Sequence, residues 1–182
     1  DAQSAAVSLH RVSVSVSVER CDCAEQADVQ RVVACYSLTS QLCGVWHAAG
    51  MLADGTVSRQ DASSLCTVHA PKADGAAALH CLLAGCVLSC CTLFSSVASL
   101  LGGRGQANYA AANASLDGLG AFCRVSGLEG VSIQWGPWAE VGMAARGEVH
   151  LKLAAAGFGL IMPGAGLCVL GAALSPLAPP VT

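Results

Sequence analysis

The sequence predicts an α/β protein whose mostly parallel sheet is covered by helices on both faces. Short apolar runs alternate with longer segments of helical spacing, which is the pattern of βαβ units. With 54% hydrophobic and only 12% charged residues, the chain is apolar enough to bury such a sheet on both sides. Its 182 residues fit one domain, so we expect a single domain over residues 1–182.

The first half of the chain predicts two strands around one helix. Val12–Val18 alternates strictly between valine and serine, which indicates a half-buried strand near a sheet edge. Ala24–Ala34 places valines on one side at helical spacing, and the apolar run Leu42–His47 follows. Asp54–Ser64 is polar and is expected to be a loop, after which helical character resumes.

The second half predicts a buried central strand and a long helix. The uncharged stretch Cys81–Leu101 is long enough to raise a transmembrane interpretation, but its serines fit a helix end, a turn at Gly85 and a strand over Cys86–Phe94 better. The remaining expected elements are a helix over Gln106–Val125, a strand over Val131–Trp135, a lid over about 140–158 and a helix over Gly164–Leu174.

The composition argues against several classes of function. A net charge of −3 without a basic stripe gives no reason to expect nucleic acid or a membrane surface as partner. Most of the eleven cysteines lie inside apolar runs, and the CxC pair Cys21 and Cys23 has no second pair at zinc-binding spacing, so we expect no metal. The odd cysteine count and the absence of a signal peptide favour an intracellular, cytoplasmic location.

The stretch Leu93–Asn113 carries the strongest indication of a site. An apolar run ends at Ser95 and Ser96, a Gly-rich segment follows, and Tyr109 lies on the next predicted helix. Ligands of open α/β sheets bind beyond the carboxyl ends of the strands, so a hydroxyl and a phenol could meet there on one substrate atom. The structural alternative is that the tyrosine packs in the core and the serine caps a turn.

A dinucleotide-binding fold normally begins with a strand and a Gly-rich turn at a helix N-terminus. No G-x-G-x-x-G occurs near the start of this chain. Either the fold is of another kind, or the chain begins after that unit.

Four strings in the chain resemble one family. They are WHAAGMLADG (46–55), HAPKADGAAALH (69–80), FSSVASLLGGRGQANYAAANASLDGL (94–119) and SIQWGPWAEVGMA (132–144). In this order they resemble the ketoreductase domain of modular type I polyketide synthases, in the short-chain dehydrogenase/reductase superfamily. The resemblance implies a Rossmann-like doubly wound parallel sheet whose first βαβ unit is missing from this chain.

The resemblance also implies an activity and partners. The reaction would be NADPH-dependent reduction of a β-ketoacyl thioester, held by phosphopantetheine on an acyl carrier protein next to flanking synthase domains. The alternatives are a fatty-acid synthase ketoreductase and a non-catalytic reductase-like scaffold.

By this resemblance the catalytic residues are Lys72, Ser96, Tyr109 and Asn113. Tyr109 matches the proton donor, and Ser96, thirteen residues earlier, matches the serine that hydrogen-bonds the substrate carbonyl. Lys72 and Asn113 match the exchanged lysine and asparagine of synthase ketoreductases. Hydride arriving at a ketone leaves negative charge on its oxygen, which a donor must stabilise and an acid must neutralise. A nearby ammonium would favour the phenolate and so help Tyr109 to act as that acid.

A cofactor site follows from the same resemblance. Asp22 matches the acid that contacts the adenine amine. The small-residue turn over which the cofactor passes would be Ala48, Ala49 and Gly50, and the turn beside the nicotinamide amide would be Gly136 and Pro137.

Substrate and stereochemical control are expected from Asp54, Trp138 and Met143, with core packing as the alternative for Trp138. Leu52-Ala53-Asp54 keeps the last acid of the Leu-Asp-Asp signature of B-type domains, and Leu101 stands where A-type domains have a tryptophan. We therefore expect a B-type product.

The family's phosphate-binding glycines, and the arginines that bind the 2′-phosphate, would lie before Asp1. A sheet without its first strands leaves backbone groups unpaired. We therefore expect the isolated chain to be poorly stable, to bind NADPH weakly and to be weakly active or inactive.

Overall fold

Three parallel strands form the sheet of this computed structural model, which describes residues 16–39, 42–142 and 157–174. The strands are β1 (Gly44–His47), β2 (Cys90–Ser96) and β3 (Val131–Trp135), in the spatial order β1-β2-β3. Trp46 of β1 lies opposite Thr92 of β2, and Phe94 of β2 lies opposite Ile133 of β3. The prediction of a central strand is confirmed, although β2 begins at Cys90 rather than Cys86.

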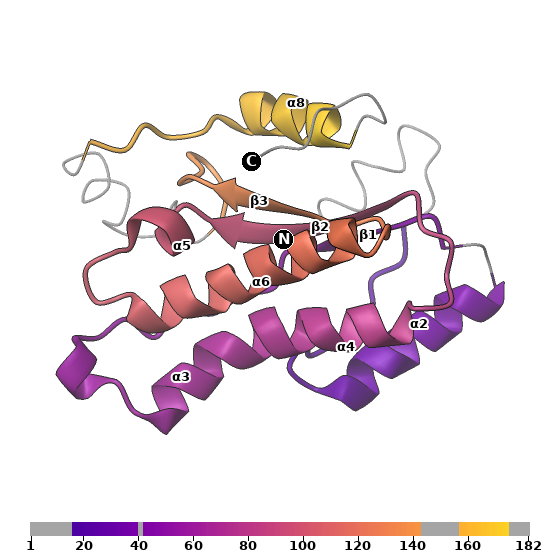
Figure 1. Cartoon of the computed structure of the whole chain (residues 1–182), viewed down its shortest axis with the longest axis horizontal. Coiled ribbons are helices and arrows are strands. Elements are labelled where there is room, and N and C mark those ends of the chain that lie inside the picture. The colour runs from indigo at the N-terminus through magenta and orange to yellow at the C-terminus, as the bar shows by residue number, and fades with distance from the viewer. Residues whose placement is uncertain (1–15, 40–41, 143–156, 175–182) are drawn as a thin grey trace.

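Helices lie on both sides of this sheet, as predicted. In Figure 1, α6 and α4 lie on one side of the strands and α8 lies on the other. The helical elements are α2 (Gln26–Thr39), η1 (Val57–Arg59), α3 (Ala62–His69), η2 (Ala70–Asp74), α4 (Gly75–Leu82), α5 (Ala98–Leu101), α6 (Ala107–Val125) and α8 (Pro163–Ala173). The helices expected over Ala24–Ala34, Gln106–Val125 and Gly164–Leu174 are therefore confirmed within a few residues.

The segment Asp54–Ser64, predicted to be a loop, contains more structure than expected. It includes the short helix η1, and α3 begins at Ala62. Asp61 caps α3, because its side chain accepts a hydrogen bond from Ser64 N at 2.7 Å and its own N–H donates to Ser64 Oγ at 2.9 Å. From this cap the helix runs through the π-helical turn η2 into α4 without a break.

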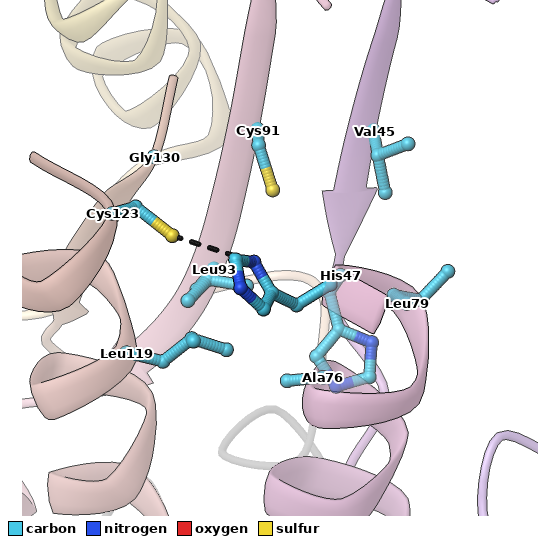
Figure 2. A pocket seen from close by; sticks show the side chains of 10 residues that line it. Val45, His47, Ala76, Leu79, Cys91, Leu93, Leu119, Cys123 and Gly130 are labelled. Carbon is cyan, nitrogen blue, oxygen red and sulfur yellow. Dashed lines mark hydrogen bonds between the residues drawn. The ribbon is translucent and has the colours of Figure 1, made fainter. Parts of the chain in front are cut away.

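The core lies between the sheet and the helices α4 and α6. Figure 2 shows side chains from β1, β2 and both helices converging there, and Ala76, Leu93 and Leu116 are its most buried apolar members. His80 Nδ1 lies 3.7 Å from Cys123 Sγ at its edge. The cavity among these residues has a volume of about 10 Å³, which is no more than one water needs, so the region is packed core and not a binding site.

A glycine allows α6 to pack closely on β3. A Cβ atom at Gly120 would lie 2.9 Å from the backbone nitrogen of Ser132. Only a residue without a side chain permits this approach, and it sets the distance between the helix that carries Tyr109 and the third strand.

Several predictions fall wholly or partly outside the described residues. Of the alternating segment Val12–Val18, residues 12–15 are not described, and Val16–Val18 do not belong to a strand, so the predicted strand is absent from that part. Of the expected lid over about 140–158, residues 143–156 are not described. Within the described ranges no helix has both the length and the hydropathy to cross a membrane, and no three His, Cys, Asp or Glu side chains gather as metal ligands.

Candidate active site

Lys72 is the charged centre of the site. It lies in the π-helical turn η2, it is 3% exposed, and its ammonium donates to the carbonyl oxygen of Phe94 at 2.9 Å. The same nitrogen lies 5.6 Å from the centroid of the Tyr109 ring, within cation–π range. Burial lowers the pKa of Lys72 to about 8, and the nearby Asp117 carboxylate opposes this shift. The structure thus brings together the lysine and the tyrosine that the resemblance paired.

The end of β1 and the turn that follows it contact this lysine. His47 Nε2 donates to the carbonyl oxygen of Lys72 at 2.9 Å, and burial lowers the pKa of His47 so that its ring is neutral at neutral pH. A Cβ at Gly50 would lie 3.0 Å from Lys72 Cε. A larger residue at position 50 would therefore press on the lysine.

Asn113 lies one helical turn after Tyr109 on α6 and is fully buried. Its Nδ2 donates to the carbonyl oxygen of Tyr109 at 2.7 Å, and Ser95 Oγ donates to the carbonyl oxygen of Asn113 at 3.2 Å. Its Oδ1 has no hydrogen-bond partner among the described residues. A buried acceptor without a partner is costly, so this atom fits a hydroxyl or amide donor of a bound group.

Ser96 lies at the carboxyl end of β2, in the position expected of a substrate-binding hydroxyl. Its Oγ accepts a hydrogen bond from Ala98 N at 3.2 Å, and the residue is half-buried. Because the hydroxyl oxygen is the acceptor in this bond, its own proton is still available to a substrate carbonyl. Ser95, the less favoured of the two serines, donates to the carbonyl oxygen of Asn113 instead.

Asp117 is a polar residue near the site that the sequence did not single out. Ser132 Oγ donates to its Oδ1 at 2.7 Å, and Gln134 Nε2 donates to its Oδ2 at 2.9 Å. Ser99 Oγ lies 2.6 Å from Oδ2 and 2.8 Å from the carbonyl oxygen of Ser96. A signal for this residue was present, because Tyr109, Asn113 and Asp117 are spaced by four along one helix.

The loop that carries Asp54 is tied to the start of α6. Asn108, also missed from sequence, is 2% exposed, and its Nδ2 donates to the carbonyl oxygen of Ala53 at 2.8 Å. Gln106 Nε2 donates to Asp54 Oδ2 at 3.1 Å. These contacts place Asp54 beside the helix turn that precedes Tyr109, whereas Met143 lies outside the described residues.

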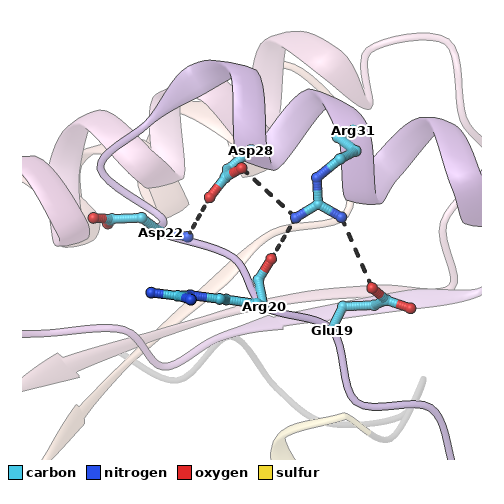
Figure 3. A network of polar contacts seen from close by, with 5 residues as sticks. All are labelled: Glu19, Arg20, Asp22, Asp28 and Arg31. Carbon is cyan, nitrogen blue, oxygen red and sulfur yellow. Dashed lines mark hydrogen bonds and ion pairs between the residues drawn. The ribbon is translucent and has the colours of Figure 1, made fainter.

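Asp22 is exposed and lies between Cys21 and Cys23, two residues that line an apolar groove. Its Oδ1 accepts from Ala24 N at 2.9 Å, and its own N–H donates to Asp28 Oδ2 at 2.9 Å (Figure 3). Arg31 of α2 pairs with Glu19 at 3.8 Å and donates to the carbonyl oxygen of Arg20, which holds the segment before Asp22 against α2. The groove has a volume of about 300 Å³ and is lined by Cys21, Cys23, Val29, Val32, Val33, Val45, Trp46, His47, Ala48, Ala49 and Leu79.

The turn after β3 packs against the segment that leads into α8. The carbonyl oxygen of Pro137 accepts from Ile161 N at 2.8 Å, and a Cβ at Gly136 would lie 3.4 Å from Ile161 Cδ1. The Trp138 ring lies 4.9 Å from that of Trp135 and fills the space left by Gly166 of α8. Trp138 is half-buried, and it packs between the turn and α8.

Comparisons with known proteins agree with this geometry. The KR domain model matches residues 1–140. Polyketide synthase GfsB of Streptomyces halstedii is 41% identical over 170 residues, covering 92% of this chain and 3% of that protein. Mycoketide-CoA synthase of Mycobacterium tuberculosis is 40% identical over 130 residues, covering 71% of this chain and 3% of that protein.

Solved structures of the same kind match most of the chain. An A-type ketoreductase from a modular polyketide synthase superposes with a TM-score of 0.87 at 36% identity, covering 91% of this chain and 35% of that chain. The first ketoreductase of the tylosin synthase gives a TM-score of 0.81 at 36% identity, covering 91% of this chain and 36% of that chain. The chain thus spans about a third of these structures and forms part of their Rossmann-like fold.

Proposed function

Since this chain belongs to the KR domain family, the ketoreductase domains of modular polyketide synthases, we propose that it carries the catalytic residues for reduction of a β-ketoacyl thioester to the β-hydroxyacyl thioester. The observation that carries the proposal is the buried Lys72 ammonium, 5.6 Å from the centroid of the Tyr109 ring and hydrogen-bonded to the end of the central strand.

In the proposed reaction a bound nicotinamide cofactor supplies hydride to the ketone carbon. Negative charge then develops on the ketone oxygen, and Ser96 donates a hydrogen bond to it. Tyr109 transfers its phenolic proton to the same oxygen, which completes the alcohol. The Lys72 ammonium stabilises the phenolate that is left, and Asn113 holds the backbone of Tyr109 through its 2.7 Å hydrogen bond.

NADPH is the proposed cofactor, and three parts of the chain support it. Asp22 and the apolar groove offer a place for the adenosine end, with Ala48 and Ala49 in the groove wall. The turn at Gly136 and Pro137 follows β3, near the carboxyl ends of the strands where ligands of this fold bind. The unpartnered Oδ1 of Asn113 supplies a buried acceptor for a cofactor hydroxyl or a water.

The proposed substrate arrives on the phosphopantetheine arm of an acyl carrier protein, because the relatives are large synthases of which this chain spans only 2–6%. Asp54 lies beside the turn before Tyr109 and is suited to orient that substrate, and we retain B-type stereochemistry as the prediction. A non-catalytic scaffold is disfavoured because a buried ammonium costs stability, and a protein without need of it would gain by replacing Lys72.

The test compares two tyrosine variants in a complete ketoreductase protein that contains this chain. Oxidation of NADPH by a β-ketoacyl thioester is followed for wild type, Tyr109→Phe and Tyr36→Phe, the two tyrosines of the chain. We expect Tyr109→Phe to lose at least about 100-fold in rate, as loss of an acid does, and Tyr36→Phe in α2 to keep the wild-type rate. Equal rates for wild type and Tyr109→Phe would remove the proposed acid, and no oxidation by the wild type would favour the scaffold.

A further inference from the structure

Asp117 occupies the third position of a polar row on α6. Tyr109, Asn113 and Asp117 follow one another at intervals of four residues and therefore lie along one side of the helix. The first two belong to the proposed catalytic set. The third is half-buried and has no role in the reaction as described above.

We propose that Asp117 is a positioning residue of the ketoreductase site, whose carboxylate keeps the Lys72 side chain charged and anchors the turn that carries Ser96. This inference rests on the proposed function, and it adds a residue that touches neither substrate nor cofactor.

The anchoring half of the proposal follows from hydrogen bonds. The carboxylate joins α6 to β3 through Ser132 Oγ at 2.7 Å and Gln134 Nε2 at 2.9 Å. It also reaches the turn after β2, because Ser99 Oγ lies 2.6 Å from Asp117 Oδ2 and 2.8 Å from the Ser96 carbonyl oxygen. A single hydroxyl proton is shared between those two acceptors, so the carboxylate and the Ser96 backbone are held by the same group.

The charge on Asp117 is secured by the same contacts. Burial works against the ionised form, but the hydrogen bonds from Ser132, Ser99 and Gln134 outweigh it and hold the pKa of Asp117 below its ordinary value. The carboxylate is therefore negative at neutral pH. Its negative charge favours the ammonium form of Lys72 and opposes the effect of burial on that group.

Other titratable groups around Lys72 do not supply this charge. His47 from β1 is neutral because burial lowers its pKa, and the neighbour from α6 is the aromatic ring of Tyr109. Asp74 in the same π-helical turn is exposed and lies 3.6 Å from His69. From β2 the lysine meets a carbonyl oxygen, that of Phe94. Among the described residues Asp117 is thus the carboxylate whose negative charge favours the Lys72 ammonium.

A purely structural role for Asp117 makes a different prediction from a charge role. A structural anchor lowers rate and stability without changing the pH at which activity is lost. A charge-supporting carboxylate also sets that pH, because Lys72 loses its proton near pH 8 in the folded protein. The two roles are separated by variants that keep or remove the charge.

The experiment measures rate against pH in a complete ketoreductase protein containing this chain, for wild type, Asp117→Asn, Asp117→Glu and Ser132→Ala. We expect the wild-type rate to fall above about pH 8 and the falling limb of Asp117→Asn to move down by about half a pH unit or more, since an opposite charge has been removed. Asp117→Glu keeps the negative charge, so its rate should fall over the same pH range as the wild-type rate. Ser132→Ala removes one hydrogen bond and should lower stability while the limb stays in place.

A second readout does not depend on activity. The Lys72 side-chain resonances are titrated by NMR in the wild type and in Asp117→Asn, and the midpoint is expected near pH 8 in the first and lower in the second. Equal midpoints, or a slower Asp117→Asn enzyme with an unmoved limb, would overturn the charge role. If the wild type fails to oxidise NADPH but the NMR midpoints differ, the proposed function fails and the inference about Asp117 stands.

Discussion

The catalytic cluster of Lys72, Ser96, Tyr109 and Asn113 and the groove beside Asp22 are built in opposite ways. The cluster is closed and polar: Lys72 is 3% exposed and Asn113 is fully buried, and both hold backbone oxygens at less than 3 Å. The groove is open and apolar, about 300 Å³ in volume, and Asp22, between two of its lining residues, is exposed. Charge development at a reacting atom requires fixed dipoles, whereas a large cofactor fragment requires room and apolar surface.

Replacement of Lys72 tests the closed region most severely. Lys72→Met should lower the rate of ketone reduction by about 100-fold or more, because the phenolate of Tyr109 loses its ammonium neighbour. The free energy of unfolding should stay the same or rise, because a buried ammonium is removed. Kinetics and denaturant unfolding measure the two effects, and Arg59→Met, at an exposed cation, is the control expected to change neither.

The pH dependence of the same variant sharpens this test. The folded-state pKa of Lys72, about 8, lies below the value of about 10.4 for an unfolded lysine. Between these values the unfolded chain binds more protons than the folded chain, so the free energy of unfolding of the wild type rises with pH from about 8. Below about pH 8 Lys72 is charged in both states, and burial of its charge destabilises the wild type fully. Any advantage of Lys72→Met in unfolding free energy should therefore shrink as pH rises from about 8; an advantage that grows would contradict the assigned burial.

The close contact of α6 with β3 tests whether the cluster depends on exact packing. Gly120→Ala places a Cβ 2.9 Å from Ser132 N and should destabilise the protein by about 1–3 kcal/mol, because backbone must move. Gly118→Ala lies on the same helix with open space around it and should stabilise by about 0.5–1 kcal/mol. Thermal or denaturant unfolding measures both changes in stability. Similar changes for the two variants would contradict a close contact between α6 and β3 at Gly120.

The smallest effect is expected in the open region. Asp22→Asn removes an exposed charge beside the groove residues Cys21 and Cys23. It should raise the KM for NADPH by about 3- to 10-fold, with little change in kcat, since one exposed polar contact is worth about 1 kcal/mol. Glu25→Gln, a neighbouring exposed acid, is the control. A loss in kcat instead of KM would mean that the groove and the cluster are coupled.

Much of the fold could be predicted from sequence where a pattern was both periodic and bounded. The helix Ala107–Val125 and the strand Val131–Trp135 were predicted within one residue, because turn residues flank them. The alternating segment Val12–Val18 had the strongest strand pattern, yet Val16–Val18 form no strand. Alternation specifies which side chains share a face of a strand. A strand also needs a neighbouring strand to pair with its backbone hydrogen-bonding groups, and the sequence pattern does not identify that neighbour.

The candidate site was predictable where residue identity alone carried the signal. Lys72, Tyr109 and Asn113 were found through their strings, and the structure places them together. Asp117 and Asn108 were missed because their importance lies in contacts across the sequence, with Ser132 and Gln134 for one and Ala53 for the other. Polar residues on a helix are common, and only the folded chain shows which of them bridge separate elements.

The π-helical turn Ala70–Asp74 makes the site depend on the count of residues as well as on their kinds. Such a turn closes its hydrogen bonds one residue later than an α-helical turn does. Deleting a single residue within it would let α3 and α4 continue as one regular helix, but each residue on one side would rotate by about 100° relative to the other. Lys72 would then leave the Tyr109 ring without any change in its own identity. Insertions and deletions in this one turn are therefore as consequential for the reaction as substitution of the lysine itself.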